Sequence, residues 1–419
     1  MRMKLKKPGQ LLLVALASVG VASLLSACNQ LTGTLTVDFV YISSARAAGP
    51  NSYGEIDVFE VNSESGKMRQ IPTSPFPSGG RNPVAEAVST DHNNLYVVNR
   101  DDNTIVQFLI GNDGKVYPQQ TVNTPGIFPI ATAVAGNMLY VADTYQPLPI
   151  CSPASPCTGS VAAFPIATST TCTAAGTTGV AAGNLCPPVV NTTISTGYWP
   201  LTLPSKPADI ITPVAITASA SNLFVAAVDT TSNAGYVFSF STDGNTLAPV
   251  NGGVPVAAGL KPSAIALDPS GTYLYVTDAN GNNVLGWTIN AGSLTPLGGS
   301  PFPAGNSPSA IVVDGQGKFA YVANAQDSNV IPYSISSGTL SRVMQNGAPV
   351  AYATDTQPVA IGIDPALNQY LYTVNFLANT LSGFQMNSTT GLLLNSQNSP
   401  FVSNANPTAV AAIPHGQKK

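Results

Sequence analysis

The chain has 419 residues, of which 44% are hydrophobic and 9% charged, with a formal net charge of −4. Its 37 glycines and 35 prolines are typical of a turn-rich globular protein that is long enough to bury a large core. The excess of 20 acidic over 16 basic residues argues against nucleic acid or anionic lipid as a partner.

The N-terminus carries the features of an export signal. Four basic residues within the first seven precede an uncharged stretch from Leu11 to Ala27, which predicts a signal peptide over residues 1–27. The ending Leu25-Ser26-Ala27-Cys28 resembles the bacterial lipobox, so we predict that Cys28 is lipidated and that residues 28–36 form a linker. We therefore expect the protein to be exported and lipid-anchored to the bacterial cell envelope. The alternative is an uncleaved membrane anchor, although a span needs roughly 20 apolar residues.

A repeat begins further along the chain. Seven times a proline is followed two residues later by an alanine at the head of an apolar run, and successive prolines are 46, 84, 49, 46, 50 and 49 residues apart. A period in the forties with strand-like residues in each unit indicates a repeat architecture. The seven pairs are Pro83/Ala85, Pro129/Ala131, Pro213/Ala215, Pro262/Ala264, Pro308/Ala310, Pro358/Ala360 and Pro407/Ala409.

A second β-rich segment follows six of these runs, with its aromatic residue 11 to 14 residues beyond the proline. The run at Pro407 has no such segment after it, whereas Val40-Tyr41-Ile42-Ser43 is such a segment with no run before it. Joining the two predicts that a C-terminal strand near residues 409–413 pairs with an N-terminal strand near residues 37–43. This pairing closes a ring and removes exposed sheet edges.

The unit from Pro262 contains four predicted strands. They cover 263–267, 274–277 and 284–289, and a short outer strand starts at Leu294. Four antiparallel strands in each of seven units predict an all-β, seven-bladed β-propeller, closed by its N- and C-terminal strands in one blade.

The propeller is expected over residues 37–414, with a tail at 415–419. Its one oversized interval, 145–212, contains every cysteine except Cys28. In an exported protein two structural disulfides are expected. The pairing of Cys151 with Cys157 and of Cys172 with Cys186 is favoured because it closes short loops, although four cysteines allow three connectivities. The spacings do not fit a zinc site. The cysteines are Cys151, Cys157, Cys172 and Cys186.

Tyr-Val-x-Asn/Asp strands such as Tyr96–Asn99 and Tyr321–Asn324, with Ser-Pro-Phe at Ser74, Ser300 and Ser399, resemble the bacterial lactonase-family propellers. That family includes propeller-type 6-phosphogluconolactonase and related YVTN-repeat surface proteins. The resemblance covers nearly the whole mature chain and implies the fold. It implies lactone hydrolysis less directly, because the repeated residues are scaffold residues.

A charged residue stands out on an innermost strand. In the Pro-x-Ala alignment Glu86 occupies a column that otherwise holds apolar residues or threonine, which makes it the candidate catalytic base. Arg46, Arg81, Arg100 and Asp101 are expected in loops near the central funnel as ligand-binding residues. The alternative is a structural ion pair of Glu86 with Arg81 or Arg100.

The remaining candidates point to no further chemistry. His92 is expected in an exposed turn at the other end of the propeller and His415 in the tail. No metal site and no cofactor are predicted. We expect a monomeric envelope lipoprotein that binds a small sugar-like ligand or an envelope protein. The alternative is a lactonase-like hydrolase that opens a sugar or related lactone.

Overall fold

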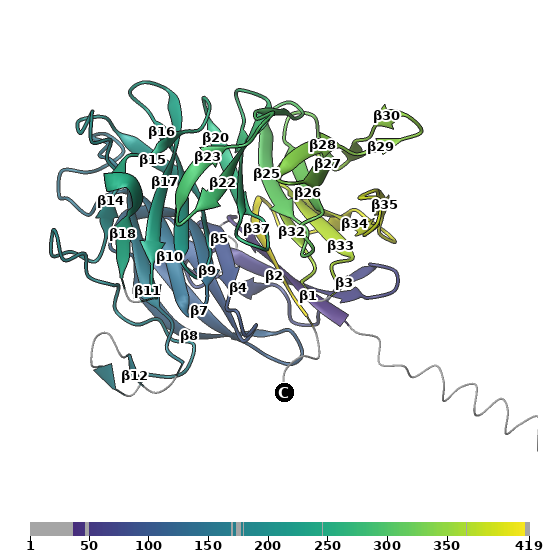
Figure 1. Ribbon diagram of the computed structural model, residues 1–419. Coiled ribbons are helices and arrows are strands. Elements are labelled where there is room, and N and C mark those ends of the chain that lie inside the picture. The colour runs from purple at the N-terminus through teal and green to yellow at the C-terminus, as the bar shows by residue number, and fades with distance from the viewer. Residues whose placement is uncertain are drawn as a thin grey trace, which may run out of the picture.

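The computed structural model describes residues 37–46, 50–168, 171–172, 177–178, 180–244, 246–365 and 367–414. These residues form seven antiparallel sheets around a central axis (Figure 1). The innermost strand of each sheet contacts those of its two neighbours, in the order β37, β5, β9, β15, β20, β25, β32 and back to β37. The chain is therefore the predicted seven-bladed β-propeller.

All blades share one plan, in which the strands are called A to D from the axis outward. Blade 1 has β37 (Pro407–Ile413), β1 (Val37–Ser44), β2 (Glu55–Asn62), β3 (Met68–Gln70) and β4 (Phe76–Pro77). Blade 2 has β5 (Pro83–Val88), β6 (Asn94–Asn99), β7 (Thr104–Ile110) and β8 (Val116–Asn123). Blade 3 has β9 (Ile127–Ala135), β10 (Met138–Tyr145), β11 (Ser160–Pro165) and β14 (Trp199–Pro200). Blade 4 has β15 (Ile211–Ala218), β16 (Asn222–Asp229), β17 (Ala234–Thr242), β18 (Leu247–Pro249) and β19 (Val256–Ala257).

The last three blades repeat the pattern. Blade 5 has β20 (Pro262–Leu267), β21 (Tyr273–Asp278), β22 (Asn283–Asn290), β23 (Ser293–Pro296) and β24 (Phe302–Pro303). Blade 6 has β25 (Pro308–Val313), β26 (Phe319–Asn324), β27 (Asn329–Ser336), β28 (Thr339–Arg342) and β31 (Tyr352–Ala353). Blade 7 has β32 (Pro358–Ile363), β33 (Tyr370–Asn375), β34 (Thr380–Met386), β35 (Leu393–Asn395) and β36 (Phe401–Val402). Outside the blades lie the hairpins β12 (Thr171–Cys172) with β13 (Thr177–Thr178) and β29 (Met344–Gln345) with β30 (Ala348–Pro349), and the 3-10 turns η1 (Pro50–Ser52) and η2 (Val250–Gly253).

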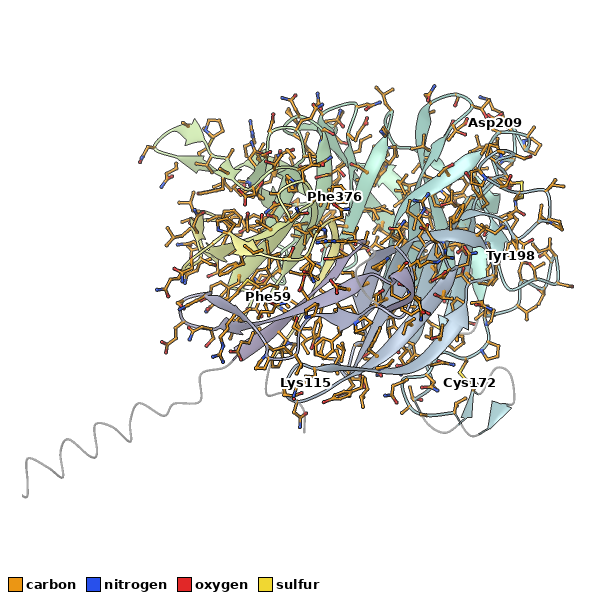
Figure 2. All side chains as sticks on the ribbon, turned by 180° about the vertical axis from the view of Figure 1, so that it is seen from behind. Phe59, Lys115, Cys172, Tyr198, Asp209 and Phe376 are labelled. Carbon is orange, nitrogen blue, oxygen red and sulfur yellow. A yellow bond between two sulfur atoms is a disulfide. The ribbon has the colours of Figure 1, made fainter. Side chains whose placement is uncertain are left out.

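The two ends of the propeller differ in their connections. Loops from strand B to C and from D to the next A form the upper end in Figure 1, and the A-to-B and C-to-D turns form the lower end. Seen from behind in Figure 2, Lys115 and Cys172 of C-to-D connections lie at the lower edge, and Asp209 of a D-to-A connection lies at the upper edge. Candidate residues can thus be assigned to an end from their place in the blade.

Blade 1 is closed by the two ends of the described chain. β1 pairs antiparallel with β37, with Tyr41 opposite Ala411 and Ser43 opposite Ala409. The hydroxyl of Thr408 lies 3.0 Å from the backbone oxygen of Ser43 and 2.9 Å from that of Pro83, so it links blade 1 to blade 2. The predicted closure is confirmed.

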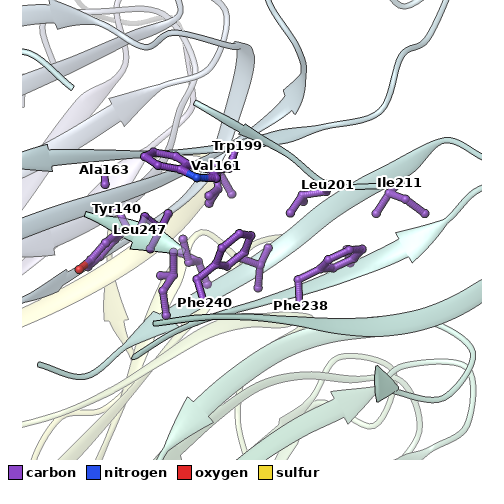
Figure 3. Close-up of a cluster of buried hydrophobic side chains, with 14 of the residues drawn as sticks. Tyr140, Val161, Ala163, Trp199, Leu201, Ile211, Phe238, Phe240 and Leu247 are labelled. Carbon is purple, nitrogen blue, oxygen red and sulfur yellow. The ribbon is translucent and has the colours of Figure 1, made fainter. Parts of the chain in front are cut away.

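Blades are held together by apolar cores that fill the space between neighbouring sheets. Figure 3 shows the core between blades 3 and 4, where Tyr140 and Val161 from one sheet and Phe238 and Phe240 from the other are all buried. Burial of such large side chains supplies most of the stabilisation, at about 1.5–3 kcal/mol for each.

The tyrosine of the repeated Tyr-Val segment also makes a polar contact between blades. The hydroxyls of Tyr41, Tyr96 and Tyr275 are buried and donate to the backbone oxygens of Gly114, Gly183 and Gly338, at 3.0, 2.7 and 2.8 Å. Each acceptor lies in the C-to-D connection of the following blade. Each of these glycines has a positive φ, and an added Cβ would approach a side chain of the preceding blade to 2.5 Å or less. In these three blades the hydroxyl is satisfied across the blade interface, whereas the equivalent hydroxyl of Tyr372 is buried and has no hydrogen-bond partner within the described residues.

Both predicted disulfides are present in the short-loop pairing. Cys151–Cys157 closes a loop between β10 and β11 at the upper end, with Cα atoms 5.4 Å apart. Cys172–Cys186 lies in the connection from β11 to β14 at the lower end, with Cα atoms 5.6 Å apart. The predicted signal peptide, Cys28, the linker and residues 415–419 lie outside the described residues. In the part of the chain that is described, no helix has the length and apolar character needed to span a membrane.

The glycine contact between blades can be tested with two substitutions. Gly338 and Gly347 have the same φ of +82°, but a Cβ would meet the ring of Tyr273 at 2.5 Å only at Gly338. We expect Gly338→Ala to destabilise the protein by about 2 kcal/mol more than Gly347→Ala, because overpacking adds to an equal backbone strain. Chemical denaturation measures the difference, and equal losses would contradict the proposed packing role.

Candidate functional site

The loops of the upper end hold most of the candidate residues. Arg46 follows β1, Arg81 precedes β5, and Arg100 and Asp101 follow β6, whereas Glu86 lies within β5. The side chains of Arg46, Arg100 and Asp101 are exposed. The blades thus place these residues on the expected elements, and their contacts decide which of them act together.

Glu86 points toward blade 1. The hydroxyl of Ser43 donates to its Oε2, while Oε1 is buried and has no hydrogen-bond partner within the described residues. Burial raises the pKa of Glu86 to about 7, against the hydrogen bonds from Ser43 and the backbone of Ala411, which lower it. The carboxyl group therefore exchanges its proton near neutral pH, as a general base or acid must.

The predicted ion pair of Glu86 with an arginine is wrong. Arg81 instead donates from Nε to Oδ1 of Asp102 at 2.6 Å and from its backbone to Oδ2 at 2.7 Å. The guanidinium of Arg100 lies 5.3 Å from the centre of the Phe128 ring. Sequence reasoning missed Ser43 as the partner of Glu86, although the predicted pairing of the chain ends brings that strand close to β5.

Arg100 belongs to a cluster that the sequence did not reveal. The rings of Phe128 and Tyr145 meet edge to face with centroids 6.1 Å apart, and Arg100 lies over Phe128. Both aromatic side chains are half-buried and Arg100 is exposed. We call Arg100, Phe128 and Tyr145 the upper cluster.

The backbone at Phe128 has a φ of +55°, which is rare for a bulky residue. Its amide donates to Oδ1 of Asn103 at 2.7 Å, and its carbonyl oxygen accepts from Thr144 at 2.7 Å. The same contact recurs where Ser307 donates to Asn282 and Asn406 donates to Asn379. The left-handed conformation is therefore part of the scaffold. The scaffold needs no aromatic side chain there, since the positive-φ residues before the strand-A proline in other blades are Asn82, Ser307, Gln357 and Asn406.

The upper cluster has the features of a small-ligand contact surface. A half-buried ring stacks on planar groups or on the C–H face of a sugar, and a guanidinium donates to ligand oxygens. Beside it, Arg81, Asp102 and Tyr53 line a groove of about 600 Å³. Asp101 accepts a hydrogen bond of 3.2 Å from the Asn82 side chain, which ties two upper loops together.

Two further buried acids have raised pKa values, and both accept hydrogen bonds from residues of the connecting loops. Burial raises the pKa of Asp143 to about 7, although its hydrogen bonds to Thr124 and Gly126 lower it. Burial also raises the pKa of Asp57 to about 6, and Asp57 accepts hydrogen bonds from Gln70 and Asn404. Over the described ranges, no three His, Cys, Asp or Glu side chains gather in a way that could hold a metal ion.

Comparison with known proteins identifies the class. The sequence matches the profile of the seven-bladed β-propeller lactonases over residues 52–146 and 202–412, so the chain belongs to the lactonase family of seven-bladed β-propellers. A search of curated proteins finds no significant match.

Solved structures of the same fold are similar in shape but distant in sequence. One is a protein of Bacteroides fragilis provisionally named a 6-phosphogluconolactonase, with 17% identity and a TM-score of 0.68 over 91% of this chain and 99% of that one. Another is a periplasmic gluconolactonase of Pseudomonas aeruginosa, with 16% identity and a TM-score of 0.67 over 90% and 99%. At such identities the likeness supports the fold and leaves the activity to be argued from the site.

The burial of Glu86 has a consequence for the pH dependence of stability. Its folded pKa of about 7 lies above its ordinary value of 4.5, so the folded protein holds a proton that the unfolded chain releases between these values. Stability must therefore fall as the pH rises from about 4.5 to 7, by on the order of 3 kcal/mol for this group.

We expect Glu86→Gln to abolish this contribution, so that the variant matches the parent near pH 4.5 and exceeds its stability at pH 8. Urea denaturation across this range measures the effect. Asp57 and Asp143 titrate in the same window, so the difference between parent and variant is the informative quantity. A difference that does not change with pH would show that Glu86 is not buried in the folded state.

Proposed function

We propose that this chain is an exported lactonase-family propeller, anchored in the cell envelope through Cys28, that binds a small sugar-like ligand at the upper cluster as a monomer. The observation that carries the proposal is the arrangement of Arg100 over Phe128, with Tyr145 beside it. An exposed cation held over a half-buried ring offers both stacking and hydrogen-bond donation to a hydroxylated ring.

Export is supported by the N-terminal sequence and by the two disulfides. Disulfides persist in oxidising compartments such as the bacterial periplasm, and here all four cysteines of the insertion are paired. Metabolic labelling with a fatty-acid analogue tests the anchor: Cys28→Ala should abolish labelling and release the protein from membranes. An unlabelled parent protein would refute lipidation.

The ligand site can be tested with variants of the upper cluster. Phe128→Ala and Arg100→Gln should each weaken the binding of glucose and glucono-1,5-lactone about tenfold, because each removes one contact of roughly 1–2 kcal/mol. Saturation-transfer NMR with titration measures affinity. Tyr117→Ala is the control, since Tyr117 is exposed on strand D of blade 2, away from the cluster. Unchanged binding in both cluster variants would refute the site, and an envelope protein would become the preferred partner.

Lactone hydrolysis is the second candidate, and the protonation behaviour of Glu86 favours it. As a base, the carboxylate would take a proton from water while the oxygen of that water adds to the lactone carbonyl carbon. The ring C–O bond would then break as the Glu86 carboxyl returns the proton to the leaving ring oxygen, which gives the hydroxy acid and restores the carboxylate. Because Oε1 is buried between blades 1 and 2, a water molecule must reach that interface. For this reason hydrolysis is the second candidate function, and ligand binding is the first.

Hydrolysis should be measured on a panel of sugar and acyl lactones with the mature protein. If Glu86 is the base, the rate rises with pH through about 7, and Glu86→Gln lowers it at least 100-fold. Ser43→Ala separates a structural from a chemical role: loss of the hydrogen bond should raise the pKa of Glu86 and shift the pH profile upward. A panel without any enhanced hydrolysis would refute this candidate and leave the binding proposal standing.

A further inference from the structure

A second pocket lies at the opposite end of the propeller. It has a volume of about 400 Å³, within the range of about 300–1,000 Å³ that is typical for small-ligand sites. Its walls come from the A-to-B turns of blades 2 and 3 and from the insertion of blade 3, at residues 166–168 and 182–183. We call it the lower pocket.

The wall made by the insertion is fixed on several sides. Gly183 donates to the oxygen of Ala167 at 2.8 Å, and Ala167 donates to Asn184 at 2.9 Å. The Tyr96 hydroxyl donates to Gly183 across the blade interface, and the side-chain amide of Gln120 exchanges two hydrogen bonds with the backbone of Leu185. The Cys172–Cys186 disulfide closes the segment. The pocket therefore has a preformed shape that the repeat alone does not provide.

The lining combines hydroxyl and amide groups with a single charge. Ser89, Thr90 and Thr168 offer hydroxyls, Asn93 and Asn137 offer amides, and Leu109 and Ile166 give an apolar surface. Asp91 carries the one charge in this described lining, and no lysine, arginine or histidine accompanies it. Desolvation by itself raises the pKa of Asp91. The hydrogen bonds from Ser89 and Asn93 together lower it by more, so that the pKa lies below its ordinary range. The pocket is thus negative at neutral pH.

We infer that the lower pocket is a second binding site, specific for a hydroxylated ligand without negative charge, and in particular for an amine-bearing sugar. Hydroxyl and amide groups match the donors and acceptors of a sugar ring, and the apolar side chains pack against its C–H face. Asp91 supplies the partner for an ammonium group and repels anions. This inference is independent of the upper cluster.

Three probes distinguish the charge requirement. With the mature protein carrying Phe128→Ala and Arg100→Gln, which removes the contribution of the upper cluster, glucosamine should bind most tightly at pH 7, glucose more weakly, and gluconate not measurably in NMR titrations. Asp91→Asn keeps the turn acceptor and should lower the affinity for glucosamine five- to tenfold while leaving glucose unchanged. Equal binding of all three probes, or an unaltered preference in Asp91→Asn, would overturn the inference.

Two kinds of variant test whether the ligand binds in the lower pocket: one fills the pocket, and the other removes the disulfide that fixes its wall. Ala182→Trp should fill the pocket and abolish glucosamine binding, while Phe128→Ala at the upper end should leave it intact. Cys172→Ser with Cys186→Ser should weaken binding, whereas Cys151→Ser with Cys157→Ser, which opens the loop at the upper end, is the matched control. Circular dichroism verifies folding of each variant. If glucosamine binding is lost in Phe128→Ala and kept in Ala182→Trp, the ligand occupies the upper cluster and the lower pocket is refuted.

Discussion

The pairing of β1 with β37 is the constraint on which the rest of the structure depends. A propeller with an unpaired blade would expose two sheet edges and leave the apolar faces of blades 1, 2 and 7 without partners. The closed blade contributes Tyr41, whose hydroxyl reaches Gly114 of blade 2, and Ser43, whose hydroxyl binds Glu86. The one carboxylate in the strand-A column thus owes its environment to the joining of the chain ends.

Much of the fold could be predicted because it is periodic. The spacing of the prolines indicated seven units, and the unmatched segments at the two ends indicated the closure. The strands of blade 5 agree with the predicted ranges to within one residue at each end where both limits were given. Periodicity works here because every blade must fill the same space with the same pattern of buried residues.

The contacts of the candidate site were harder to predict, because they join residues that no repeat relates. The column alignment identified Glu86 as unusual in polarity, yet it gave no information on which side chain faces it from blade 1. Phe128 was missed because it precedes Pro129, the residue at which the repeat alignment of that blade begins. Arg81 was considered as a partner of Glu86, whereas the structure pairs it with Asp102 of the same blade. The lower pocket depends on an insertion that lacks internal repetition and could not be placed from its composition.

The two ends of the molecule present different chemistry to their surroundings. The upper end carries an exposed arginine, Arg100, over a half-buried ring, and the lower end carries a carboxylate among hydroxyls and amides. Blade 3 contributes to both ends, since Phe128 and Tyr145 lie at the upper ends of β9 and β10 and the segment closed by the Cys172–Cys186 disulfide lies at the lower end. One enlarged blade therefore contributes to both proposed binding surfaces, which differ in charge.

The contact between Thr408 and Ser43 spans 365 residues of sequence, and this separation governs how the protein is made. The first strand can pair with β2 early, but its other edge stays unpaired until β37 has been synthesised. Contacts of such high sequence separation slow folding and prolong the exposure of unpaired strand edges, which favour aggregation. A chain cleaved within or before β37 would lose this strand, and the exposed edge of β1 would then favour aggregation.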